Sequence, residues 1–254
     1  MAYDEKFVRG LEWMWGDGFL SPGGREEVRE ILRGTSIEGQ TVLDIGCGIG
    51  GIDRLLVTEH KARKVVAIDV IETLVTRARL DTEAAGLTGR IEYRLVEPGQ
   101  LDFDDAEFDV VFTKDAIVHI KDKRSIYEDI RRVLRPGGVV VGSDWLGGDK
   151  TEQSERVRAW LDFSKLDFHF HTAAQLKRLL MQVGFSSVRT RDRNGWYGDA
   201  VRVEIASVSG ERRSGFVEKF GEEMAANRLQ SSTLKMKAVD AGELRPTHFS
   251  AVRT

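Results

Sequence analysis

The chain has 254 residues, of which 41% are hydrophobic and 31% are charged, and its formal net charge is −3. A chain of this length can bury a sizeable core and fits one α/β domain with additions. The small negative charge gives no electrostatic reason to expect nucleic acid or an anionic membrane as a partner. No apolar run approaches the ~18 residues that are needed to span a bilayer.

The chain contains a single cysteine, Cys47, so no disulfide can form within it. This cysteine usage favours a reducing, cytoplasmic compartment. The N-terminus lacks a basic region followed by an apolar run, so we expect no secretory signal. No Cys/His cluster has the spacing of zinc ligands, so we expect no metal site.

Residues 1–37 are expected to form an N-terminal lid. They begin with an aromatic-rich segment and continue through Ser21-Pro22-Gly23-Gly24 into a predicted helix, Arg25–Arg33. The aromatic side chains are expected to cover the edge of the sheet that follows.

An apolar strand, Thr41–Ile45, runs directly into the glycine-dense turn Gly46-Cys47-Gly48-Ile49-Gly50-Gly51, which opens a helix. Glycine permits positive φ and lets a ligand approach the main chain closely. Asp44 precedes the glycines. Asp69 ends the next strand, Val65–Asp69, where an acid can accept hydrogen bonds from ribose hydroxyls. The alternative for both acids is helix capping, but their spacing favours a nucleotide-type cradle.

The chain up to residue 145 continues to alternate between helices and strands, which predicts a parallel sheet with crossover helices. The expected elements are a helix over 71–85, a strand over 91–96, a strand over 108–113, a helix over 124–134 and a strand over 139–143. Beyond residue 144 the regularity weakens. We expect helices over 152–163, 172–183 and 216–230, a final strand pair over 185–191 and 201–208, and a poorly defined tail over 231–254.

Three segments together resemble the class I S-adenosylmethionine (SAM) methyltransferases. They are Asp44-Ile45-Gly46-Cys47-Gly48-Ile49-Gly50-Gly51, Phe108-Asp109-Val110-Val111-Phe112 and Leu134-Arg135-Pro136-Gly137-Gly138-Val139-Val140-Val141. The resemblance implies a Rossmann-like, doubly wound, seven-stranded α/β sheet in a single domain, 1–254. It divides this domain into the lid at 1–37, a SAM-binding core at 38–145, and substrate-side elements with the final strands at 146–254.

The same resemblance implies SAM as the cofactor and S-adenosylhomocysteine as its product. It places Glu97 and Pro98 beside the adenine, where members of the family usually carry aspartate; a solvated loop acid is the alternative for Glu97. The residues expected at the cofactor are Ser21, Asp44, Gly46, Gly48, Gly50, Asp69, Val70, Glu97, Pro98 and Lys114.

The segment Thr113-Lys114-Asp115-Ala116-Ile117-Val118-His119 follows the fourth strand. Its polar groups are therefore expected at the carboxyl end of the sheet, where ligands bind. His119 comes four residues after Asp115, which predicts one helical turn with both side chains on the same face. A histidine there can accept a proton near neutral pH, and a purely structural histidine is the alternative.

The likeness narrows to the phosphoethanolamine N-methyltransferases on three further features. They are Ser21-Pro22-Gly23-Gly24, Lys114 to Ile120, and the tail around Lys235 that ends Phe249-Ser250-Ala251. This resemblance implies a catalytic tyrosine–histidine pair at Tyr3 and His119 and an active-site acid at Asp115. It also implies a phosphate-binding lysine at Lys235 and a SAM-side serine at Ser21, and Lys114 stands where the family has arginine.

The chain departs from that family where phosphate would bind. Trp145 replaces a tyrosine, and residues such as Ser164 stand near the place of an arginine ligand. Serine does not replace a bidentate arginine, so we expect an acceptor with at most one anionic group, held by Lys235. Trp145 and Trp160 either form an aromatic wall around a methylated cation or pack in the core.

The sequence therefore predicts a SAM-dependent methyltransferase that N-methylates a small polar amine, phosphoethanolamine-like or related. His119, Tyr3 and Asp115 are the expected catalytic residues. The alternatives are methylation of a small carboxylated amine or of a thioether sulfur, and a SAM-binding subunit without catalytic activity. The expected partner is a small molecule, and the sequence does not determine the oligomeric state.

Overall fold

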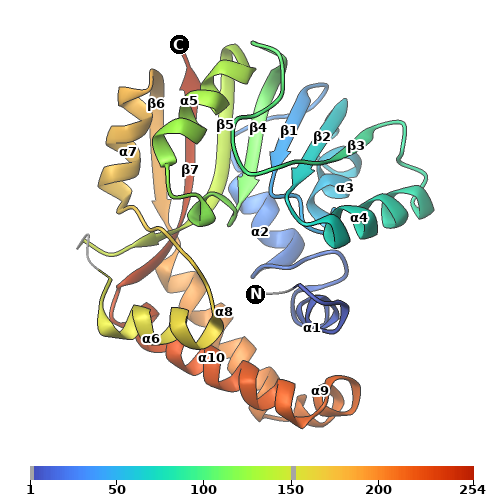
Figure 1. Ribbon diagram of the computed structural model, residues 1–254, viewed down its shortest axis with the longest axis vertical. Coiled ribbons are helices and arrows are strands. Elements are labelled where there is room, and N and C mark those ends of the chain that lie inside the picture. Colours follow the sequence, from blue (N-terminus) through green and yellow to red (C-terminus); the bar gives the residue numbers. More distant parts are fainter. Residues whose placement is uncertain (1–2, 150–152) are drawn as a thin grey trace.

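The computed structural model of the protein describes residues 3–149 and 153–254 (Figure 1). Within these residues, one seven-stranded sheet has the order β3-β2-β1-β4-β5-β7-β6. The strands are β1 (Thr41–Ile45), β2 (Lys64–Asp69), β3 (Ile91–Leu95), β4 (Phe108–Lys114), β5 (Leu134–Gly147), β6 (Phe185–Asp192) and β7 (Leu244–Arg253). The first five strands pair in parallel, whereas β7 runs antiparallel to both β5 and β6. This is the predicted doubly wound α/β sheet.

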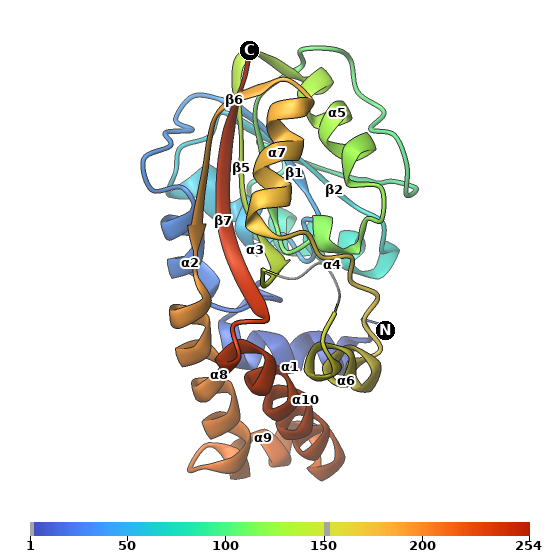
Figure 2. The same ribbon diagram turned by 90° about the vertical axis from the view of Figure 1, so that its left-hand side faces the viewer.

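Helices cover both faces of the sheet, and α2 and α7 lie on opposite sides of it (Figure 2). One face is covered by α5 (Lys123–Val133) and α7 (Ala173–Gln182), and the other by α2 (Gly24–Ile31), α3 (Gly51–Thr58) and α4 (Glu72–Ala84). Successive strand residues point to opposite faces. On β1, Leu43 therefore joins the core under α5 and α7, while Val42 joins the core under α2, α3 and α4.

A further layer of helices lies beyond the carboxyl ends of the parallel strands (Figure 1). It consists of α1 (Glu5–Trp15), α6 (Glu155–Ser164), α8 (Asn194–Ser209), α9 (Arg213–Phe220) and α10 (Glu222–Asp240). α10 packs along α8 and also against α6. Trp13 of α1 meets Phe216 of α9 edge-on, with ring centroids 5.2 Å apart. Segments from both halves of the chain thus close over the strand ends.

The first five strands and their connecting helices lie within a few residues of their predicted positions. Thr172 and Gln175 form a capping box at the start of α7. Among the described residues, no helix combines the length and the apolar character that crossing a membrane requires.

The prediction of a strand over 201–208 is wrong, because these residues lie in α8. The alternation of Val201 and Val203 with polar residues is typical of a strand. However, Val201, Glu204 and Val208 are buried at helical spacing, and Val203 is 57% exposed. The strand that pairs with β6 is β7, which lies in the segment predicted as a poorly defined tail.

Two local predictions also need correction. The helix expected over 216–230 is two helices, α9 and α10, which are separated at Gly221 with φ +84°. Asp115 and His119 do not share a helical turn. Asp115 follows β4 with φ +58°, and His119 ends a 3-10 turn, η1 (Ile117–His119).

Candidate active site

The glycine turn between β1 and α3 forms a main-chain cradle at the carboxyl end of the sheet. Gly46 has φ +84°, and a Cβ at this position would clash with the Cβ of Ala116. Gly50 has φ +78°, and a Cβ there would clash with the hydroxyl of Tyr93. Only glycine satisfies both the backbone conformation and the available space at these two positions.

Asp69 ends β2 beside this cradle. Its Oδ2 accepts a hydrogen bond from the N–H of Gly48 at 2.9 Å, and its Oδ1 accepts one from the N–H of Ile71 at 3.0 Å. Burial raises the pKa of Asp69, and the backbone hydrogen bonds act against that rise. Each carboxylate oxygen has a second lone pair. The side chain is thus fixed in place and can still accept hydrogen bonds from a ligand.

Two buried carboxylates lie beneath the turn, Asp44 of β1 and Asp53 of α3, which are 1% and 0% exposed. Among the described residues none of their four oxygens has a well-formed hydrogen bond, and the two carboxyl groups interact mainly with each other. Burial and then the charge of Asp53 raise the pKa of Asp44, and burial raises the pKa of Asp53 to about 7. The two buried carboxyl groups face each other beneath the cradle and hold protons more tightly than exposed acids do. Sequence reasoning missed Asp53, whose position in the first turn of α3 is the available signal.

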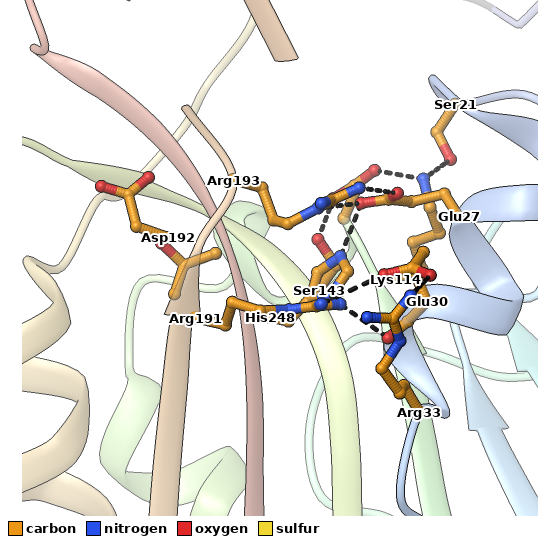
Figure 3. Close-up of polar contacts among 12 residues, drawn as sticks. Ser21, Glu27, Glu30, Arg33, Lys114, Ser143, Arg191, Asp192, Arg193 and His248 are labelled. Carbon is orange, nitrogen blue, oxygen red and sulfur yellow. Dashed lines mark hydrogen bonds and ion pairs between the residues drawn. The ribbon is translucent and has the colours of Figure 1, made fainter. Parts of the chain in front are cut away.

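Lys114 joins β4 to the lid segment (Figure 3). Its Nζ donates to the hydroxyl of Ser21 and, at 2.8 Å, to Oδ2 of Asp115. The N–H of Asp115 donates to the carbonyl of Ser143 on β5 at 2.8 Å. A non-glycine residue in the left-handed region costs about 1–3 kcal/mol, and such strain clusters at functional sites. Asp115 is in this conformation, and its carboxylate neutralises the buried Lys114.

His119 follows at the end of η1, with its ring edge-on to Phe168 and the ring centroids 4.8 Å apart. The residue remains exposed to solvent overall. Partial desolvation and then the charge of Lys123 lower the pKa of His119. Lys123 is buried, and its Nζ donates to the carbonyls of Ile117 at 2.6 Å and Ile120 at 2.7 Å. Lys123 therefore holds the turn that carries His119. Because its pKa is lowered, His119 is neutral at pH 7.

Tyr3 precedes α1 and lies at the same site. Its ring meets Phe7 edge-on, with centroids 5.8 Å apart. Burial and then the negative charges of Asp69 and Asp115 raise the pKa of Tyr3. Its hydroxyl therefore stays protonated and lies near both carboxylates. In the described part of the chain no hydrogen bond joins Tyr3 to His119, so a direct pairing of the two stays a prediction.

Trp145 near the end of β5 and Tyr197 of α8 form an aromatic wall inside the core, with ring centroids 4.8 Å apart and planes at 82°. The ring centroids of Trp160 and Trp145 are 5.4 Å apart. Trp160 is 3% exposed and lies in the core between α6, α8 and α10. A cavity of about 10 Å³, enough for one water molecule, adjoins this wall. Its lining is Pro22, Glu27, Lys114, Asp115, Ser143, Trp145, Trp196, Tyr197 and Pro246. Residues of the lid, β4, β5 and α8 therefore meet at this cavity.

Lys235 of α10 is engaged in a buried ion pair. Its Nζ lies 2.6 Å from Oε2 of Glu204 on α8, and the two side chains are 8% and 2% exposed. Arg228 approaches Oε1 of the same carboxylate at 3.5 Å. Sequence reasoning missed Glu204 and Arg228, because the strand predicted over 201–208 concealed the helical register that faces α10.

A second ion network fastens α2 to β6, to β7 and to the start of α8 (Figure 3). Glu27, which is 3% exposed, lies 2.6 Å from Nη2 of Arg193 and 2.5 Å from Nε2 of His248. Arg191 bridges two further members: its Nη2 lies 2.9 Å from Nδ1 of His248, and its Nη1 donates to Oε2 of Glu30 at 3.1 Å. Burial acts to raise the pKa of Glu27, but His248 and Arg193 outweigh it and hold that pKa below its usual value. This network, which sequence reasoning missed, fixes the lid segment next to the small cavity.

The remaining predicted cofactor residues lie at the neighbouring strand ends. Val70, Glu97 and Pro98 are exposed. Asp69 pairs with Leu95 across β2 and β3, so Val70 and Glu97 follow at the same sheet edge. Across the described ranges, no group of three His, Cys, Asp or Glu side chains could hold a metal ion.

A larger hollow of about 410 Å³ lies along the loop between β3 and β4. Its lining is Gln100, Leu101, Asp102, Phe103, Asp105 and Arg132. This lining includes none of the predicted site residues, so the candidate site is the edge with the cradle.

Known proteins resemble this chain in sequence. Residues 43–142 match the family described as a methyltransferase domain. Over 254 residues the chain is 28% identical to phosphoethanolamine N-methyltransferase 3 of Arabidopsis thaliana. The aligned region covers 100% of this chain and 50% of that protein. The chain spans about half the length of the curated relatives that it matches.

Solved structures share the fold. One is phosphoethanolamine N-methyltransferase 2 of Haemonchus contortus in complex with phosphomonomethylethanolamine and S-adenosylhomocysteine. It has a TM-score of 0.89 and 24% identity, over 97% of this chain and 57% of that chain. Another is a Galdieria sulphuraria protein provisionally assigned as a sarcosine dimethylglycine methyltransferase. It has a TM-score of 0.83 and 21% identity, over 99% of both chains. The predicted fold and the predicted resemblance are confirmed.

Proposed function

We propose that this chain, a class I methyltransferase by its fold and its matched domain, is a SAM-dependent enzyme that N-methylates a small polar amine. One observation carries the proposal: the glycine cradle with Asp69 and the neutral base His119 lie at the same edge of the sheet. The activity named for the relatives, phosphoethanolamine N-methylation, supports the acceptor class.

The residues at the cradle fit SAM. When bound, SAM supplies a methyl group carried on a sulfonium. Asp69 would accept hydrogen bonds from the ribose hydroxyls, and Glu97 would meet the adenine. The main chain at Gly46 to Gly50 would admit the methionine part, and the ammonium group of that part would favour the ionised form of Asp44 beneath the turn.

The acceptor nitrogen attacks only with a free lone pair, so a protonated amine must first lose a proton. His119 is neutral at pH 7 and accepts this proton, and Tyr3 and Asp115 orient the amine beside it. Alignment of the nitrogen with the methyl group supplies most of the rate. The lid formed by α1 and the Ser21 segment excludes water.

Calorimetric titration with SAM tests the cofactor. The wild-type chain should bind SAM, and Asp69→Ala should weaken binding by about 1–3 kcal/mol because buried ribose hydroxyls lose their acceptor. Glu72→Ala makes the same charge change at an exposed position in the first turn of α4 and should leave the affinity unchanged. A wild-type chain without SAM affinity contradicts the proposal.

Transfer of a radiolabelled methyl group to a panel of small amines and one thioether tests the reaction. We expect methylated amines as products. A thioether needs no proton removal, so transfer to the thioether alone would contradict N-methylation and the role of His119 together.

For the compartment we propose the cytoplasm, on the basis that the sequence has a single cysteine, Cys47, which is buried. Fractionation of the source cells with an antibody against this chain checks this assignment, and recovery from an oxidising compartment would contradict it.

A further inference from the structure

α8 and α10 enclose a cluster of charged side chains next to the aromatic wall. Glu204 lies between Lys235 at 2.6 Å and Arg228 at 3.5 Å. Burial acts to raise the pKa of Glu204, but the two cations outweigh it and hold that pKa below its usual value. The carboxylate is therefore ionised. Two cations and one carboxylate leave this buried cluster with one net positive charge.

The cluster also contains hydrogen-bond donors that are not used. The Nη2 atom of Arg228 and the hydroxyl of Tyr197 are both buried, and neither has a hydrogen-bond partner in the described ranges. Nζ of Lys235 stands 5.8 Å from the centroid of the Tyr197 ring, so these groups share one region. Buried polar groups in proteins are nearly always hydrogen-bonded. Unused donors beside an excess positive charge therefore indicate an anionic ligand.

Tyr197 connects this cluster to the proposed acceptor site. It lines the small cavity together with Asp115 and Trp145. Arg228 connects the cluster to the lid, because its guanidinium lies 5.1 Å from the centroid of the Phe7 ring, and Phe7 in turn meets Tyr3. One end of a small acceptor can thus lie near Asp115 while its other end reaches the charged cluster.

We infer that Tyr197, Arg228 and Lys235 form the subsite for the anionic end of a zwitterionic acceptor, an amine that carries one carboxylate. The inference rests on the proposed methyl-transfer function and narrows its substrate class. A carboxylate matches the single net positive charge of the cluster. A phosphate monoester carries a charge of about −1.5 to −2 at pH 7 and would leave surplus negative charge buried beside Glu204.

Steady-state kinetics with SAM and matched acceptors tests the charge of the acceptor. The panel contains ethanolamine, phosphoethanolamine, and the amino carboxylates glycine, β-alanine and γ-aminobutyrate. We expect kcat/KM for the best amino carboxylate to exceed the values for ethanolamine and phosphoethanolamine by ~10-fold or more.

Variants of the cluster test which residues form the subsite. Tyr197→Phe removes only an unpaired hydroxyl, and it should raise KM for the amino carboxylate ~10-fold and raise KM for ethanolamine much less. Lys235→Met would leave the buried Glu204 with only the more distant Arg228 as a cationic partner, so it is combined with Glu204→Gln to keep the fold. Lys237→Met, at an exposed position of the same helix, is the matched control and should change neither KM. Calorimetric titration of the amino carboxylate into each variant measures binding independently of turnover.

Two results would overturn the inference. One is a kcat/KM for phosphoethanolamine above that of every amino carboxylate. The other is an equal effect of Tyr197→Phe on the amino carboxylate and on ethanolamine. Neither result affects the proposed N-methylation. A chain that binds SAM but methylates no amine would contradict the proposed function instead, and the calorimetric titration would still test the subsite.

Discussion

At the scale of single residues, the proton-accepting role depends on His119. The His119→Ala variant should lower kcat about 10²–10⁴-fold, because a positioned base is lost, while SAM affinity stays unchanged. His169→Ala is a matched control, because the contact of this residue with Val118 runs through its main chain, and its rate should stay near that of the wild type. A near-wild-type rate for His119→Ala at pH 7 would refute the role.

The lowered pKa of His119 also sets the pH dependence. Desolvation and then Lys123 move the pKa of His119 below its ordinary value of about 6.5, so the neutral form is already dominant at pH 7. We expect kcat/KM to be flat through pH 7 and to fall only when the pH drops through the lowered value. A fall that begins well above pH 6.5 would show that another group controls the rate.

At the scale of elements, Glu27 holds α2 to Arg193 at the start of α8 and to His248 on β7. Glu27→Gln should lower the free energy of unfolding by about 3 kcal/mol at pH 7, because it leaves the partly buried Arg193 and the buried His248 without their carboxylate. The pKa of Glu27 is held below its usual value. Its stabilisation is therefore complete above the unfolded value near 4.5 and is lost as the pH falls through the folded value, where variant and wild type converge.

Urea denaturation at pH 7 and again below pH 4 measures this difference. Glu26→Gln removes the same charge from the neighbouring position, whose side chain is 75% exposed, and should change stability by less than about 0.5 kcal/mol. Equal effects of the two substitutions would show that the network contributes no more than a surface pair.

At the scale of the whole molecule, the acids beneath the cradle make stability depend on pH in the opposite direction. Burial raises the pKa of Asp53 from 3.8 to about 7, so the folded state binds more protons than the unfolded state between these values. Stability from this group therefore falls as the pH rises through that window. Asp53→Asn should raise the free energy of unfolding by about 2 kcal/mol at pH 8, which raises the melting temperature by a few degrees. At pH 4 the rise in melting temperature should be smaller. Thermal melts check this, with the exposed Asp102→Asn as control; a gain that is larger at pH 4 would contradict it.

The sequence by itself determined the parallel half of the sheet, the glycine turn and Asp69. These features are local, because each apolar strand ends directly in the polar residues that it positions. Only the tertiary structure decided the buried ion pairs that surround the site. The Val201–Val208 segment has the alternation of a strand, and its packing against α10 makes it a helix that places Glu204 opposite Lys235. Glu27 meets Arg193 across 166 residues of chain, and no local pattern identifies a partner at that distance. Such ion pairs form only because the fold buries both charges together, and burial is a property of the packed molecule.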